Sequence, residues 1–150
     1  MKNAFDKNDT AEIIGRINNL TPTTQRLWGT MSVAQMLAHC NVSYELIYDD
    51  KHPRPKGFQK FFLKAFVKKF VVNEVPYKPN LRTGPQFIVS SDKNFETEKN
   101  RLIAHIQKTQ ELGASHFDGK ESHSFGVLSK NEWNNMFVKH LDHHLNQFGV

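Results

Sequence analysis

The sequence is poor in cysteine and in long apolar runs, and each shortage excludes a class of protein. Cys40 is the only cysteine, so no disulfide can form within the chain. A lone cysteine suits a reducing compartment, and we expect the protein in the cytoplasm. No stretch reaches the roughly 18–20 consecutive apolar residues that a membrane-spanning helix needs. The first residues also lack the apolar centre of a secretory signal, so we expect none.

Strand signals are equally scarce, because period-two alternation is limited to one candidate, Gln86 to Ser90. Helical apolar spacing is common instead. We therefore expect an all-α protein, a four-helix bundle with one extra short helix and long connecting loops, formed by residues 1–150 as a single domain. The four expected long helices are Ala11 to about Asn19, Val33 to about Tyr48, Asn94 to about Leu112, and Ser129 to Gly149, and the short one is Phe58 to Val72.

The last of these segments, Ser129 to Gly149, has the clearest helical pattern. It opens with a capping box in which its first residue and Glu132 satisfy each other's backbone amides. At 100° per residue, His140 and His144 lie one turn apart in the apolar stripe, whereas Lys139 falls on the polar face. Two imidazoles four residues apart on one helix face can hold one metal ion.

A third histidine is available on the second expected helix, which begins with a capping box of Ser32 and Gln35. His39 lies on the flank of that helix's apolar stripe, a position that can face a neighbouring helix. Spacing alone does not single it out as a ligand. Core histidines satisfied by hydrogen bonds remain the alternative interpretation of the cluster. His143 lies at the margin of the last helix's stripe, so we prefer His144 as the partner of His140.

Two blocks carry a family resemblance: MSVAQMLAHC, from Met31 to Cys40, and FGVLSKNEWNNMFVKHLDHHLNQFG, from Phe125 to Gly149. Together they resemble the DinB/YfiT-like superfamily of metalloenzymes, and within it a domain-of-unknown-function branch that Arg16 to Ser32 also fits. The resemblance covers essentially the whole chain. It implies a four-helix bundle with one histidine on the second helix and a pair on the last. Here these positions are His39, His140 and His144.

The resemblance also implies a cofactor and a reaction. The cofactor is a divalent metal ion (zinc, nickel or iron), and the substrate is a small molecule. Members add low-molecular-weight thiols such as bacillithiol or mycothiol to electrophiles, which makes the protein a candidate metal-dependent thiol S-transferase. Many relatives follow the histidine pair with an arginine-containing stretch, which is absent here, and the middle of this chain has no substrate motif.

Two further functions stay open: a metal-dependent hydrolase that uses bound water, and a non-catalytic helical protein that binds a small ligand or partner. No catalytic residue is assigned beyond the metal ligands. We expect the substrate pocket to be lined by Met36, Trp133 and Phe137, and Glu45 and Asp142 are candidates for orienting the ligands. We give the neighbouring cysteine no catalytic role, and the protein is expected to be a monomer or homodimer.

The segment from Lys51 to Asn73 contains basic residues and no acid, within a chain of formal net charge +5. Interleaved lysines and aromatics suit nucleic acid or an anionic membrane, but also a helix packed on the bundle. We favour packing, because docking to a core requires such an apolar arc. The expectation is therefore that its lysines face water and that nucleic acid and membranes are not partners. The arc consists of Phe58, Phe61, Phe62, Ala65 and Phe66.

Overall fold

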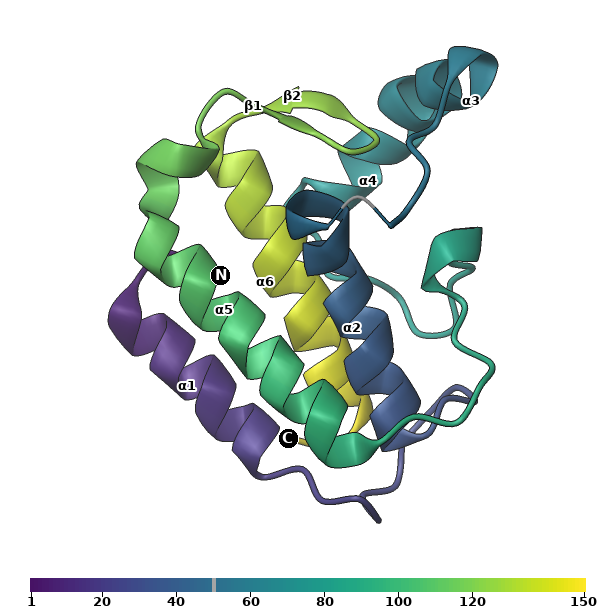
Figure 1. The fold of residues 1–150 in the computed structure, drawn as a ribbon, viewed down its shortest axis with the longest axis vertical. Helices are drawn as coiled ribbons and strands as arrows, with labels where there is room; N and C mark the ends of the chain where they lie inside the picture. Colours follow the sequence, from purple (N-terminus) through teal and green to yellow (C-terminus); the bar gives the residue numbers. More distant parts are fainter. Residues whose placement is uncertain (50) are drawn as a thin grey trace.

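The computed structural model describes residues 1–49 and 51–150, and four long helices run side by side through it (Figure 1). Helix α5 contacts α1 and α2, and α6 contacts both α2 and α5. The expectation of a mostly helical, all-α protein is confirmed, apart from one small hairpin. The long helices are α1 (Lys7–Asn18), α2 (Val33–Tyr48), α5 (Phe95–Phe117) and α6 (Lys130–Gln147).

Shorter elements fill the connections between these helices. An interrupted helix follows α2, and a single 3-10 turn precedes α5. An antiparallel hairpin joins α5 to α6, with Lys120 opposite Leu128. In chain order the short elements are α3 (Gly57–Phe62), the π-helical turn η1 (Leu63–Val67), α4 (Lys68–Val71), η2 (Pro85–Phe87), β1 (Lys120–Ser122) and β2 (Gly126–Leu128).

Local capping decides where the long helices begin. The capping boxes of Ser32 and Ser129 are both formed as expected, so α2 and α6 begin at the residues that follow them. The expected start of α1 at Ala11 is wrong, because the helix begins four residues earlier, at Lys7. Its cap is the Asp6 side chain, which accepts hydrogen bonds from the backbone amides of the second and third residues that follow it.

The expected strand at Gln86 to Ser90 is wrong, since Pro85 begins a 3-10 turn at that point. The two strands lie instead on either side of a turn that the Ser122 hydroxyl stabilises, donating to the Gly126 carbonyl and accepting from the Phe125 amide, both at 2.9 Å. Each strand has three residues, too few for alternation to reveal it in the sequence.

The core lies between the long helices and is rich in aromatic rings. Tyr44 of α2 stacks on Phe137 of α6 at a ring-centroid distance of 5.3 Å, and Phe117 packs against both Phe137 and Trp133 at 5.5 Å. Met36, Trp133 and Phe137 are each 1% exposed. These three residues, which we expected to line a substrate pocket, therefore fill the core.

The helix from Gly57 to Val71 is turned opposite to the sequence expectation. Two of its lysines face the rest of the protein: Lys60 pairs with Glu121 of the hairpin at 3.2 Å, and Lys68 pairs with Glu132 of α6 at 2.8 Å. Its phenylalanines are 47% to 80% exposed, and none of them is buried. The expectation that the apolar arc docks on the core is wrong, because Lys60 and Lys68 face the hairpin and α6 while the phenylalanines face outward.

Lys139 of α6 is also placed differently from its expected polar, solvated face. It is 4% exposed, and its ammonium donates to the carbonyls of Phe70 and Asn73 and to the Asn73 side chain, at 2.7–2.8 Å. Burial lowers its pKa to about 8. The lysine thus fastens the end of α4 to the middle of α6.

Because the phenylalanines of α3 are exposed, we expect Phe61→Ala to change the free energy of unfolding by no more than about 0.5 kcal/mol. Phe137→Ala should cost about 3–5 kcal/mol, since it removes a ring packed against other aromatic rings in the core. Urea unfolding followed by circular dichroism measures both. A loss of several kcal/mol in Phe61→Ala would mean that this helix packs on the core after all.

Candidate metal centre

Three histidines come together between two neighbouring helices: His39 lies on α2, and His140 and His144 lie on α6. Their ring centroids lie 4.5–4.9 Å apart, and one potential ligand atom of each lies within 4.8 Å of the others. His39 and His144 are buried and His140 is partly buried. The convergence of His39, His140 and His144 that the resemblance implies is thus present in the fold.

Two of these imidazoles have a defined tautomer. His39 Nδ1 lies 2.8 Å from the Phe87 carbonyl, which can only accept, so this nitrogen carries the proton. His144 Nδ1 lies 2.8 Å from Gln147 Oε1, and the amide nitrogen of Gln147 donates to the Trp28 carbonyl at 2.8 Å. That second bond fixes the orientation of the amide. In the neutral rings of His39 and His144, Nε2 is therefore a bare acceptor.

His140 has a partner that suits either tautomer. Its Nδ1 lies 2.9 Å from the Ser43 hydroxyl, which can donate or accept. Its Nε2 lies 2.9 Å from His39 Nε2. Because the His39 nitrogen is bare, this contact is a hydrogen bond only when His140 carries its proton on Nε2 and Ser43 donates to Nδ1. If the Ser43 hydroxyl rotates so that it accepts, the proton of His140 can lie on Nδ1 instead. His140 Nε2 is then also a bare acceptor.

All three rings are neutral at pH 7. Burial, aided by the neighbouring His39, lowers the pKa of His144 to about 3. Burial also lowers the pKa of His39, although the hydrogen bond to the Phe87 carbonyl opposes this. The pKa of His140 falls well below its usual value through burial and through the other two rings. Neutral imidazole is the form that binds metal ions.

The donor set suits a metal ion in its chemistry, and one pair of its nitrogens is close to the required spacing. Two imidazole nitrogens on one tetrahedral zinc ion lie about 3.3 Å apart, given bonds of about 2.0–2.1 Å. The observed Nε2 atoms of His39 and His140, at 2.9 Å, need to separate by only a few tenths of an ångström. Histidine ligands in proteins usually donate their second nitrogen to a carbonyl, carboxylate or water. Here all three second nitrogens have an oxygen partner.

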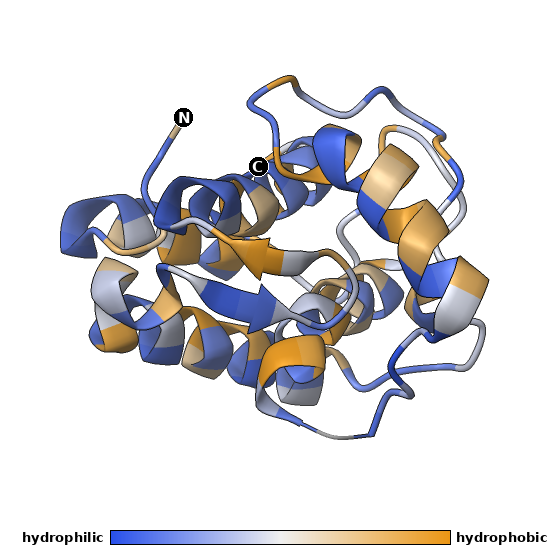
Figure 2. Cartoon of the chain, turned by 90° about the horizontal axis from the view of Figure 1, so that it is seen from above, coloured by the Kyte–Doolittle hydropathy of each residue, from blue (hydrophilic) through white to orange (hydrophobic). Residues whose placement is uncertain are grey.

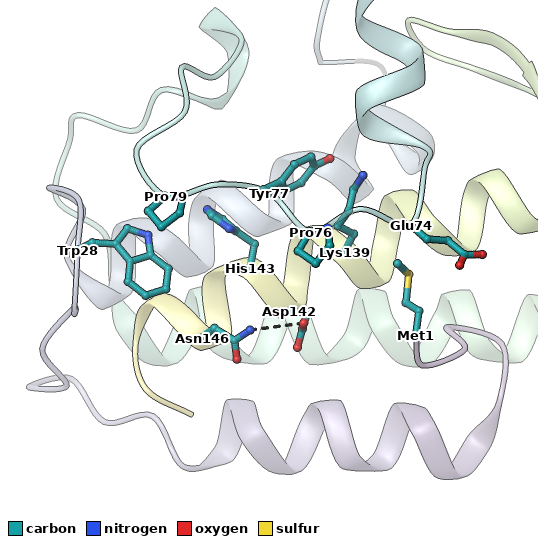
Figure 3. Close-up of a pocket in the computed structure, with 10 residues that line it drawn as sticks. All are labelled: Met1, Trp28, Glu74, Pro76, Tyr77, Pro79, Lys139, Asp142, His143 and Asn146. Atoms are coloured by element: carbon teal, nitrogen blue, oxygen red, sulfur yellow. Dashed lines mark hydrogen bonds between the residues drawn. The ribbon is translucent and has the colours of Figure 1, made fainter.

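His143 lines a cavity of about 130 Å³ (Figure 3), and its ring stands edge-on to that of His144 at 4.9 Å between centroids. Its ring lies 6.0 Å from Trp28 and 5.7 Å from Tyr77 between centroids. None of the three clustered histidines lines this cavity. The cavity therefore borders the outside of the cluster, where Trp28 also holds Gln147.

The other candidates from the sequence serve different purposes. Glu45 pairs with Arg101 and Lys51 and not with the cluster. Asp142 pairs with Arg16 of α1 at 2.6 Å. Burial raises the pKa of the Cys40 thiol far above its usual value, so the thiol is inert.

The residues that do orient the rings are Ser43, Phe87 and Gln147, and sequence reasoning did not assign them. Spacing carries a faint signal for two of them, since Ser43 lies one turn after His39 and Gln147 lies one turn after His144. Phe87 ends the 3-10 turn η2, which no periodicity connects to the cluster.

Fold and cluster together define a mostly helical protein with a candidate three-histidine metal centre. Comparison with protein families then identifies it further: the chain belongs to the family described as "Protein of unknown function (DUF1569)", whose model matches residues 2–149. No match was found among curated proteins or among solved structures. Of the helices in the described part of the chain, none has the length and apolar character to cross a membrane.

The support of His144 by Gln147 leads to a prediction about metal affinity. We expect Gln147→Leu to weaken zinc binding about 10–100-fold, because the ring loses the acceptor that fixes its tautomer. Gly29→Ala should weaken it as well, since the added Cβ would lie 2.5 Å from the Gln147 amide nitrogen. Competition with a chromogenic chelator measures the affinity. The control is Gln107→Leu, at an exposed position of α5, and equal affinity of Gln147→Leu and this control would contradict the assignment.

Proposed function

We propose that the protein is a metal-dependent enzyme in which His39, His140 and His144 bind one divalent ion through Nε2. The observation that carries this proposal is that every Nδ1 pairs with an oxygen atom while one potential ligand atom of each ring lies within 4.8 Å of the others. Zinc, nickel and iron all accept imidazole ligands. Three protein ligands leave a position open, as in catalytic rather than structural sites.

When bound, such an ion supplies Lewis-acid chemistry, lowering the pKa of a thiol or water molecule beside it so that a nucleophile is present at neutral pH. The surrounding residues supply the environment. The Phe87 ring lies 5.4 Å from that of His39 and 5.8 Å from that of His140, which shields the cluster from water. The Ser43 hydroxyl accepts from His140 Nδ1 when that nitrogen carries the proton and donates to it when it does not. The Gln147 amide keeps the His144 ring oriented.

The proposed reaction is transfer of a low-molecular-weight thiol to an electrophile. The resemblance to the DinB/YfiT-like superfamily supports it, because the chain has four long helices with one clustered histidine on α2 and two on α6. A four-helix bundle of that superfamily is the fold we propose for this family. A reaction that consumes a small thiol also suits a cytoplasmic location, where such thiols are kept reduced.

The test compares metal-loaded with chelated protein, using a panel of thiols that includes bacillithiol and a chromogenic aryl halide as the electrophile. We expect conjugation that depends on metal and falls to the rate of free metal in His140→Ala. His116→Ala, at an exposed position near the end of α5, is the matched control and should retain activity.

Equal rates with loaded and chelated protein would contradict thiol transfer. Metal-dependent hydrolysis of esters or amides by the same preparations would favour the hydrolase. Metal binding without either activity would favour a protein that binds a small ligand or partner.

A further inference from the structure

The helix from Gly57 to Val71 carries a row of aromatic rings on its outer side, the side away from the hairpin and α6. These five rings form what we term the phenylalanine face. Its members are Phe58, Phe61, Phe62, Phe66 and Phe70, which are 80%, 63%, 47%, 52% and 61% exposed.

The rings are grouped rather than scattered. Phe58 and Phe61 lie 6.5 Å apart between ring centroids, and Phe62 and Phe66 lie 5.3 Å apart. Single exposed apolar residues are normal on protein surfaces, but a contiguous aromatic group marks a surface that binds something. The hydrophobic residues of this helix stand at the edge of the molecule in Figure 2.

The opposite side of the helix is fastened to the protein, which fixes the direction of the phenylalanine face. Lys60 and Lys68 pair with Glu121 and Glu132, and Lys139 binds the carbonyls at the end of α4. The first turns of this helix extend beyond the hairpin and clear of the four long helices (Figure 1). A flat surface can therefore reach the face without meeting the bundle.

The chain around the phenylalanine face has charge of one sign. Between Lys51 and Asn73 there is no acidic residue. Within the described residues, Lys56, Lys64 and Lys69 have no carboxylate within ion-pair distance, and the Lys69 ammonium lies 5.0 Å from the ring centroid of Phe70. A partner must therefore accept aromatic rings and supply negative charge beside them.

We propose that the phenylalanine face docks on an anionic lipid surface. A helix with aromatic residues on one side and lysines beside them lies in the headgroup region, with its rings among the upper acyl chains and its ammonium groups near the phosphates. A second copy of the chain fits less well, because it would bring two basic helices together. This proposal replaces the expectation from the sequence that membranes are not partners, because that expectation assumed that these phenylalanines are buried.

The test is co-sedimentation of the purified protein with vesicles. We expect it to bind mixed phosphatidylcholine–phosphatidylserine vesicles, to bind pure phosphatidylcholine weakly, and to dissociate as salt screens the lysines. The double variant Phe61→Ser/Phe62→Ser should lose binding, whereas Leu81→Ser, at a 61% exposed position outside the helix, should not. Because all three residues are exposed, circular dichroism should report the same unfolding curve for each variant.

A second pair of variants tests the charge separately. Lys56→Gln/Lys69→Gln should lower the partition coefficient about tenfold or more at low salt. Lys7→Gln/Lys93→Gln, which removes the same charge from exposed positions elsewhere, should lower it much less. Absence of binding to the mixed vesicles, or equal binding by the phenylalanine variant, would overturn the proposal. A wild-type dimer in sedimentation velocity that Phe61→Ser/Phe62→Ser converts to a monomer would show that a second copy covers the face instead.

Discussion

The hydrogen bonds to the Nδ1 atoms of three histidines are the constraint on which the account of this protein depends. An imidazole that donates through Nδ1 presents a bare Nε2, and a buried bare nitrogen needs a partner. At His39 and His144 the acceptors are a carbonyl and a fixed amide, so the choice of tautomer is forced. The Nε2 atom of His39 lies 2.9 Å from that of His140, and one potential ligand atom of each of the three rings lies within 4.8 Å of the others, so the cluster could hold a metal ion.

Much of the surrounding structure keeps these acceptors in place. Gln147 lies at the end of α6, where Arg16 of α1 binds Asp142 and the carbonyl of Val150, and thereby fastens the last turns of that helix. The backbone amide of Leu27 donates to the Gln147 carbonyl at 2.8 Å, so the loop before α2 and the end of α6 hold each other. A change in these distant contacts would therefore shift the Gln147 amide, and with it the ring of His144.

The parts of this structure that local chemistry determines were predictable from the sequence. Capping boxes of neighbouring residues set the starts of α2 and α6, and the spacing of His140 and His144 placed both rings on one helix face. The position of His39 across from them required the family resemblance, because no local pattern relates residues that far apart.

What was not predictable depends on contacts between distant segments. An amphipathic pattern says that Gly57 to Val71 has two faces, but not which of them meets the protein. The lysines that face the protein meet Glu121 and Glu132, two carboxylates far later in the chain that no local pattern connects to this helix. Lys139 is similar, since a polar position on the helical wheel of α6 becomes buried only when the chain near Asn73 crosses it.

The most direct test of the central claim is the metal content of protein purified without a histidine tag, measured by elemental analysis after exposure to excess zinc, nickel, manganese or iron and removal of free ion. We expect about one divalent ion per chain, lost in His39→Ala, His140→Ala and His144→Ala, because each removes one of three ligands. His143→Ala should retain it, since that ring faces Trp28 and Tyr77. A wild-type protein that takes up none of these ions, or one that loses its ion only in His143→Ala, would contradict the account.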